Sequence, residues 1–424
     1  MLIRQATLLD GRVADVRLAE RITEVARDLT PEAGEAVVEA GGGTLLPGLH
    51  DHHLHLRAAA AAIDSVTAGP PVAHTASDLA RMLADAAPGA DGWIRAVGYH
   101  ESVAGDLDRR RLDALGPSAP LRVQHRSGAL WMLNSAALER IGAADHPDGR
   151  LPSTDPRLVA IPHRDPDLRM LGRRFARYGV TGVTDATPDL DAEDLAALRK
   201  ALPQNVFGLA PGKRILADDR LDLDELTGWI RRCHTDDRPV AVHCVTAAQL
   251  VVTIAALRAA GAHRGDRIEH AAMVPDDTLE DLAALGVTVV TQPNFLAERG
   301  EAYRRDIPAT EQSQLWRIGS LMGAGITVAG STDAPFGDLD PWAAMRAAIA
   351  RTAAESVAPR QALQMFLGSA EDPGRPREIA AGQPGDICLL AAPPEQVLAE
   401  LDAAMVVLTA VRGAPLEADA DRRE

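Results

Sequence analysis

The strongest constraint on the fold is a regular alternation between two sequence patterns. From about residue 179, short runs rich in β-branched residues alternate with segments of helical pattern. Because strands that alternate with helices form parallel sheets, this pattern predicts an α/β fold. We expect strands at 179–185, 206–216, 239–244, 267–273, 287–292 and 326–333.

Helix signals lie between the expected strands. Asp222 is the expected N-cap of a helix over 222–234, and Thr246 with Gln249 forms a capping box for a helix that ends near Gly261. Pro275 suits the first turn of a further helix. Other helices are expected over 191–202 and from 340–341 to about 354.

Two more strands would complete a barrel. Residues 45–56 form one, and both 93–99 and 121–128 qualify for the other, of which we favour 121–128. Eight parallel βα units predict a (β/α)8 TIM barrel, which takes roughly 250 residues. An open doubly wound sheet is the alternative, although no glycine-rich dinucleotide-binding motif follows any expected strand.

The two ends of the chain differ from the alternating region, because both contain short β-like runs. We therefore expect one small β-sandwich domain assembled from residues 1–46 and 378–424. The barrel would occupy residues 47–377.

The composition limits the class of protein. Hydrophobic residues make up 46% of the 424 residues, which is enough for a large core, and the net charge of −16 argues against a nucleic-acid partner. The three cysteines form no Cys-x-x-Cys pair, and no signal peptide or membrane-spanning run is recognised. These features predict a cytoplasmic protein without a nucleic-acid or membrane partner.

The densest chemical signal is the segment His50-Asp-His-His-Leu-His55, at the end of the expected strand 45–56. Because side chains alternate between the faces of a strand, His53 and His55 point the same way, and His50 and His52 point the other way. Two imidazoles on one face can reach one metal ion, since zinc–nitrogen bonds of about 2 Å require such convergence.

Four other residues extend this candidate site. His243, His270 and Asp333 lie at or near the ends of expected strands, and active sites in (β/α)8 barrels collect at that rim. Lys213 is one of only two lysines among 44 basic residues, and lysine can lose its proton whereas arginine cannot. A lysine carbamylated by CO2 is an anion that can bridge two metal ions.

The sequence around these residues resembles the amidohydrolase superfamily, and in particular amidohydrolase family 3, the N-substituted formamide deformylase-like branch. The matching segments are Leu46-Pro-Gly-Leu-His-Asp-His-His-Leu-His55, Arg267-Ile-Glu-His270, Val290-Thr-Gln-Pro-Asn294 and Gly330-Ser-Thr-Asp-Ala-Pro335. There are three departures. The chain is shorter than many members of that branch, mostly between the first two strands. Ala129 stands where relatives tend to have a histidine, and Lys213 lies in a Pro-Gly-Lys-Arg context rather than an apolar one.

The resemblance implies a metal-dependent hydrolase that cleaves a non-peptide carbon–nitrogen bond in a small amide, formamide or cyclic amide. It implies that His53, His55 and Asp333 hold one divalent ion, that His243 and His270 hold a second, and that carbamylated Lys213 bridges them. Zinc is the favoured metal. A hydroxide bridging the two ions would attack the carbonyl, with Asp333 as general base and then acid. The resemblance is also compatible with a homodimer.

Further residues near the expected rim loops are candidates for substrate contact. They are His100, Glu101, His125, Arg126, Trp131, Asn134, Asp185, Gln292 and Asn294. Alternatively, Asn134 and Asp185 cap helices and Trp131 packs in a core. We expect structural roles for Cys244 and for His74, His146, His163, His234 and His263.

Two other functions fit parts of the sequence. A mononuclear deaminase of the same superfamily typically has a glutamate three residues beyond the histidine of the fifth strand, where this chain has Thr246. A non-catalytic, amidohydrolase-like binding protein would usually have lost metal ligands, and all six candidate ligands are present. The number of metal ions per chain, two, one or none, distinguishes the three hypotheses.

Overall fold

The computed structural model describes residues 1–162, 165–352 and 354–418. The chain forms two compact units, one of residues 1–56 and 168–424 and the other of residues 57–167. His163 and the last six residues of the predicted segment 378–424 lie outside the described residues.

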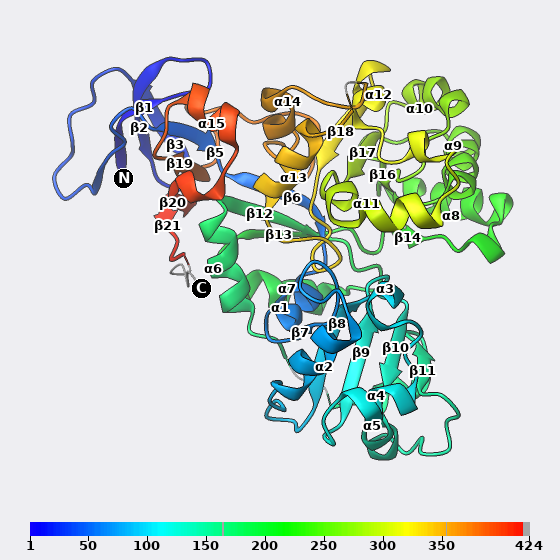
Figure 1. Cartoon of the computed structure of the whole chain (residues 1–424). Coiled ribbons are helices and arrows are strands. Elements are labelled where there is room, and N and C mark those ends of the chain that lie inside the picture. The colour runs from blue at the N-terminus through cyan, green and yellow to red at the C-terminus, as the bar shows by residue number, and fades with distance from the viewer. Residues whose placement is uncertain (163–164, 353, 419–424) are drawn as a thin grey trace. The chain divides into compact units, whose positions relative to one another are not determined.

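An eight-stranded sheet in the first unit takes strands from both ends of the chain (Figure 1). Its order is β21-β20-β19-β5-β1-β2-β3, and β4 pairs with β1. Antiparallel pairing of β5 with β19 joins the two ends, and Leu45 and Leu389 lie opposite each other in its buried cluster. The two ends therefore share one sheet, while the domain boundaries expected from the sequence stay a prediction. The strands are β1 Leu2–Thr7, β2 Val13–Leu18, β3 Ile22–Ala26, β4 Val37–Glu39, β5 Thr44–Pro47, β19 Ile387–Leu390, β20 Val406–Val411 and β21 Ala414–Pro415.

Eight parallel strands of the same unit form two further sheets, ordered β13-β12-β6 and β14-β15-β16-β17-β18. Hydrogen bonds join the segment after β18 to the end of β6: Asp333 N donates to His53 O at 2.9 Å, and His55 N donates to Ala334 O at 2.8 Å. The carboxyl ends of β6 and β18 therefore meet. The strands are β6 Leu49–Leu54, β12 Val180–Asp185, β13 Asn205–Gly208, β14 Lys213–Ile215, β15 Ala241–Cys244, β16 Arg267–His270, β17 Thr288–Thr291 and β18 Thr327–Gly330.

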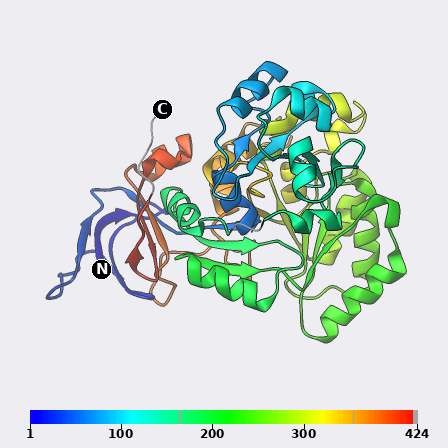
Figure 2. The ribbon, with the colours of Figure 1, turned by 90° about the horizontal axis from the view of Figure 1, so that it is seen from below.

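Helices connect and flank these parallel strands (Figure 2). The expected N-terminal caps of two helices are confirmed. At the start of α8 the Asp222 side chain accepts a hydrogen bond from Glu225 N, and at the start of α9 Thr246 forms a capping box with Gln249. Pro275 precedes a short 3-10 helix, Asp276–Thr278, rather than lying in its first turn. None of the described helices is long and apolar enough to cross a membrane. The helices are α6 Leu168–Arg177, α7 Ala192–Ala201, α8 Leu223–Thr235, α9 Ala247–Ala260, α10 Leu279–Leu285, α11 Asn294–Asp306, α12 Ile318–Gly323, α13 Pro341–Ile349, α14 Pro359–Gln364 and α15 Pro394–Glu400.

Two single strands expected from the sequence are each divided in the structure. The expected strand 206–216 is β13 and β14, separated by four residues. The expected strand 45–56 is β5 and β6, which belong to different sheets. The division lies at Gly48, where an added Cβ would stand 2.1 Å from Cγ2 of Thr181. Glycine is therefore required where the chain passes from one sheet to the other.

The second unit contains a separate five-stranded sheet ordered β11-β10-β9-β8-β7. The prediction that 121–128 forms a barrel strand was wrong, because β9 pairs with β8 and β10 in this sheet. The alternative, 93–99, is β8 of the same sheet. A strand pattern shows that a segment is extended but not which strands it pairs with. The elements are β7 Val66–Thr67, β8 Ile94–Tyr99, β9 Leu121–His125, β10 Leu130–Leu133 and β11 Arg150–Pro152, with α2 Ala76–Ala84, α3 Glu101–Ala104, α4 Arg109–Leu115 and α5 Ser135–Arg140; α1 Leu56–Ile63 leads into the unit.

Candidate metal centre

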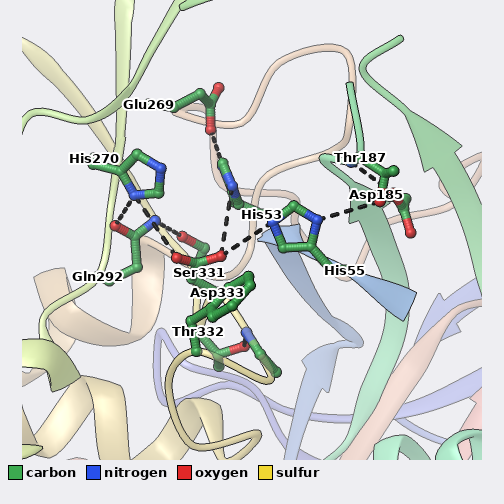
Figure 3. A network of polar contacts seen from close by, with 12 residues as sticks. His53, His55, Asp185, Thr187, Glu269, His270, Gln292, Ser331, Thr332 and Asp333 are labelled. Atoms are coloured by element: carbon green, nitrogen blue, oxygen red, sulfur yellow. Dashed lines mark hydrogen bonds and ion pairs between the residues drawn. The ribbon is translucent and has the colours of Figure 1, made fainter. Parts of the chain in front are cut away.

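Three of the predicted ligands converge where β6 and β18 end (Figure 3). Ligand atoms of His53, His55 and Asp333 all lie within 4.8 Å of one another. Oδ1 of Asp333 is 3.7 Å from Nε2 of His53 and 3.5 Å from Nε2 of His55. Two imidazoles and one carboxylate at these distances form a set that suits a divalent transition metal such as zinc.

Two further histidines extend this group. The ring centroid of His270 lies 4.7 Å from that of His53 and 4.4 Å from that of His243. Burial lowers the pKa of His55 to about 4 and that of His243 to about 3. It also places the pKa values of His53 and His270 well below the usual range. All four rings are therefore neutral at neutral pH, as metal coordination requires.

Lys213 is buried at the start of β14, with 5% of its surface exposed. Its Nζ has no hydrogen-bond partner, and neither does Oδ1 of Asp333. Burial lowers the pKa of Lys213 to about 8, although Glu269 and Asp333 oppose this shift, and burial raises the pKa of Asp333 to about 8. Buried polar atoms without partners are costly. A carbamate on Lys213 and a cation beside Asp333 would give both atoms partners.

The Nδ1 atoms of three of these histidines have partners outside the ligand set (Figure 3). Nδ1 of His53 bonds to Glu269, Nδ1 of His55 lies 3.2 Å from Oγ1 of Thr187, and Nδ1 of His270 lies 2.8 Å from Oε1 of Gln292. The Nε2 atoms of His53 and His55 are the ring nitrogens that face Asp333. Metal-binding histidines characteristically have such a partner, which fixes the tautomer and orientation of the ring.

The partner of His53 is itself firmly held. Arg267 Nε donates to Oε1 of Glu269 at 2.6 Å, and its Nη2 donates to the other carboxylate oxygen at 3.1 Å and to the backbone oxygen of His52 at 2.6 Å. Glu269 is fully buried. Arg267 and Glu269 therefore connect β16 directly to β6 beside the centre.

Glu269 was not predicted to be a functional residue, although it lies within the segment Arg267-Ile-Glu-His270 that resembles the family. Regular alternation places Glu269 and His270 on opposite faces of a strand. The structure departs from this rule because His270 has a φ of 69° and Ala271 a φ of 46°. This left-handed backbone at the end of β16 lets both side chains contact the centre, and such uncommon conformations occur often at functional sites.

Gln292, Asp185 and Asn294 were predicted to contact substrate, and the structure shows their bonds within the protein. Gln292 links Nδ1 of His270 to Oγ of Ser331, at 2.8 Å on each side. Asp185 accepts from Leu56 N at 2.9 Å and from Thr187 N at 2.8 Å. Asn294 donates to Glu298 at 2.9 Å, and its Oδ1 is buried without a partner. Among these three side chains, Asn294 therefore has a buried polar atom that another group could bind.

The other predicted substrate contacts lie in the unit of residues 57–167. Asn134 caps α5, because its Oδ1 accepts from Ala137 N at 2.9 Å and from Leu121 N at 3.0 Å. The structural alternative left open for it is therefore confirmed. Glu101 bonds to Nε2 of His125 at 3.1 Å and lies 3.7 Å from Nε2 of His100. Glu101, His100 and His125 therefore form one cluster. Trp131 is half-buried beside two arginines. Arg126 follows the end of β9.

Three of the residues expected to be structural make contacts with other side chains of the protein. Sγ of Cys244 lies 3.3 Å from Oγ1 of Thr253 on α9. His234 bonds to Asp266 and His263 to Asp237, both at 3.1 Å.

Comparison with known proteins gives both a family and a set of similar folds. A family model described as "Amidohydrolase family" matches residues 36–416. An N-substituted formamide deformylase from Arthrobacter pascens is 32% identical over 150 residues, which are 34% of this chain. Those residues span about a quarter, 26%, of the length of this curated relative.

Solved structures show a similar fold at low sequence identity. An uncharacterised metal-dependent hydrolase from Pyrococcus horikoshii OT3 has a TM-score of 0.67 and 18% identity, over 93% of this chain and 97% of that one. An adenosine deaminase from Xanthomonas campestris with bound zinc has a TM-score of 0.59 and 15% identity, over 98% of this chain and 92% of that one. At these identities the likeness concerns the fold.

Proposed function

Because this chain belongs to the amidohydrolase family, we propose that it is a metal-dependent hydrolase of a small molecule that cleaves a carbon–nitrogen bond other than a peptide bond. The observation that carries the proposal is the convergence of His53, His55 and Asp333, with the Nδ1 atom of each histidine held by another partner. Amides, formamides and cyclic amides are the substrate classes that we favour.

We place two divalent ions, preferably zinc, at this centre. His53, His55 and Asp333 would hold one ion, His243 and His270 would hold the other, and a carbamate on Lys213 would contribute to both. The burial of Lys213 supports the carbamate, because only a neutral amine attacks CO2 and burial favours the neutral form. The free ammonium would repel cations, so the same residue without a carbamate opposes metal binding.

The centre lies on what we take to be a single (β/α)8 barrel. The strands β6 and β12 to β18 number eight and pair in parallel within their two sheets. The hydrogen bonds of His55 and Asp333 bring the first and last of these strands together. Five of the six predicted ligands lie near or beyond the carboxyl ends of these strands, where barrel active sites lie, and Lys213 is the first residue of β14.

The reaction adds water across the carbon–nitrogen bond. Bound divalent ions would lower the pKa of water towards about 7 and polarise the substrate carbonyl. Asp333 takes one proton from the attacking water and returns it to the nitrogen of the leaving amine. The carbonyl carbon gains the oxygen of water, so the products are a carboxylic acid and an amine.

Metal content and turnover by Asp333→Asn test this proposal together. The wild-type chain should contain two ions and hydrolyse at least one member of a panel of N-substituted formamides, N-acyl amines, cyclic amides and carbamates. Asp333→Asn should nearly abolish turnover and retain most of the metal. Full activity of this variant would remove Asp333 from the mechanism.

The metal content of the wild-type chain also decides between the competing functions. One ion per chain with deamination of an amino-substituted ring would indicate a mononuclear deaminase. A chain that binds no metal and hydrolyses none of the panel would indicate a binding protein.

A further inference from the structure

Two arginines lie directly opposite each other in the sheet of residues 57–167. Arg95 on β8 is the cross-strand partner of Arg122 on β9. Both guanidinium groups lie over the ring of Trp131, 5.5 and 5.3 Å from its centroid. Like charges directly opposite in a sheet destabilise it. The indole ring attracts each cation but leaves the charge unneutralised.

Neither arginine has a carboxylate within 4 Å among the described residues. Arg95 donates to Oγ of Ser65 at 2.6 Å, whereas Nε of Arg122 is buried without a hydrogen-bond partner. Burial lowers the pKa of Arg95 to about 10, and the charge of Arg122 adds to this shift. The pair is thus two partly buried positive charges, of which that of Arg122 is partly offset by the carboxylate of Asp91.

Both arginines line a cavity of about 120 Å³, and Trp93 lines it with them. Nε1 of Trp93 is also buried without a partner. Asp64 and Asp91 also line the cavity. Oδ1 of Asp91 accepts from Trp93 N at 3.0 Å, and the charge of Asp91 opposes the lowering of the pKa of Arg122 by burial. The cavity has room for several groups the size of a water molecule, enough for a phosphate or a short carboxylate.

We propose that this cavity binds a small oxyanion, a phosphate or a carboxylate, between Arg95 and Arg122. Its oxygens accept hydrogen bonds from the two guanidinium groups, and its negative charge offsets theirs. Charge-assisted hydrogen bonds of this kind are the strong ones, and arginine suits both anions. Every residue of the site lies within 57–167, so the site is separate from the metal centre.

The test is titration of the full-length chain with inorganic phosphate and, separately, with acetate, at constant ionic strength set by chloride. Calorimetric binding and the melting temperature are followed for wild type, Arg122→Gln and Arg95→Gln. The matched control is Arg81→Gln, because Arg81 lies in the same unit and pairs with Asp78 at 3.0 Å outside the cavity. Phosphate bound at the metal centre would persist in all of these variants.

We expect saturable binding of at least one anion to wild type and to Arg81→Gln, with at least a roughly tenfold weaker affinity in Arg122→Gln and Arg95→Gln. The anion that binds shows whether a phosphate or a carboxylate is preferred. Two results would overturn the proposal: no saturable binding of either anion to wild type, or unchanged binding in both cavity variants. If one variant does not fold, the other still decides.

Discussion

Glu269 contacts His53, one of the predicted metal ligands, without itself belonging to the predicted ligand set. It bonds to Nδ1 of His53, and Arg267 holds it in place. We therefore expect Glu269→Gln to weaken metal binding about ten- to a hundredfold with the fold retained, since partners of this kind typically contribute that much. Metal titration against a competing chelator measures the affinity.

The matched control for this prediction is Glu355→Gln. Glu355 is also buried and bonded to an arginine, Arg317, and it accepts from Ser320 N at 3.0 Å, but it does not contact the predicted ligands. Its loss should leave metal affinity unchanged. Equal metal affinity in Glu269→Gln and wild type would show that Glu269 serves only packing.

Lys213 offers a sharper comparison, because the chain contains one other lysine, Lys200. Lys213→Arg keeps the positive charge but cannot form a carbamate, so we expect it to bind at least one metal ion fewer per chain. Lys200→Arg, on the exposed surface of α7, should bind as many ions as wild type. Elemental analysis counts the metal, and mass spectrometry in bicarbonate detects added CO2. Unchanged metal content in Lys213→Arg would exclude a bridging carbamate.

The sequence predicted the candidate metal ligands better than the residues that hydrogen-bond to those ligands. His53, His55 and Asp333 were predicted together because regular strands end at one rim, and the structure brings them together. Glu269 was missed because its position depends on the left-handed backbone of His270, which alternation cannot reveal. Thr187 and Ser331 were missed because short hydroxyl side chains carry no signal until their neighbours are placed.

Gly48 separates two elements that the sequence presented as one strand. A Cβ at this position would lie 2.1 Å from Cγ2 and 2.2 Å from Oγ1 of the buried Thr181. We expect Gly48→Ala to lower the free energy of unfolding by about 1–3 kcal/mol, as overpacking typically does. Urea denaturation measures the change.

Two variants make this prediction specific. Thr181→Ala, added to Gly48→Ala, should recover part of the loss, because it removes the two atoms that would clash first. Gly323→Ala in α12 should change stability little, since a Cβ there meets nothing within 4 Å. A double variant no more stable than Gly48→Ala would indicate that the backbone, not the Thr181 side chain, requires glycine.

The elements that the sequence predicted well are those with local signals at both ends. The helix α9 has its capping box at Thr246 and its end at Gly261, as expected. Residues 121–125 do form a strand, but sheet membership depends on contacts between distant segments. The whole sheet of residues 57–167 therefore went unrecognised, although its individual strands had the right pattern.

For the whole molecule, the two compact units contain separate sites. The predicted metal ligands lie in residues 1–56 and 168–424, and Arg95 and Arg122 lie in residues 57–167. Each unit also has a buried apolar cluster of its own. Multidomain chains often depart from two-state unfolding, so we expect calorimetry to resolve two transitions.

Ligands should then act on these transitions separately. A ligand at a hundred times its dissociation constant stabilises the form that binds it by about 2.7 kcal/mol. Removing metal with a chelator should lower the midpoint of one transition, and adding phosphate or acetate, whichever binds, should raise the midpoint of the other. In Arg122→Gln the anion effect at the same concentration should be smaller, while the chelator effect remains. If both treatments instead shifted the midpoint of a single transition, the chain would unfold as one cooperative unit. The two compact units would then not unfold independently, and the prediction would be wrong.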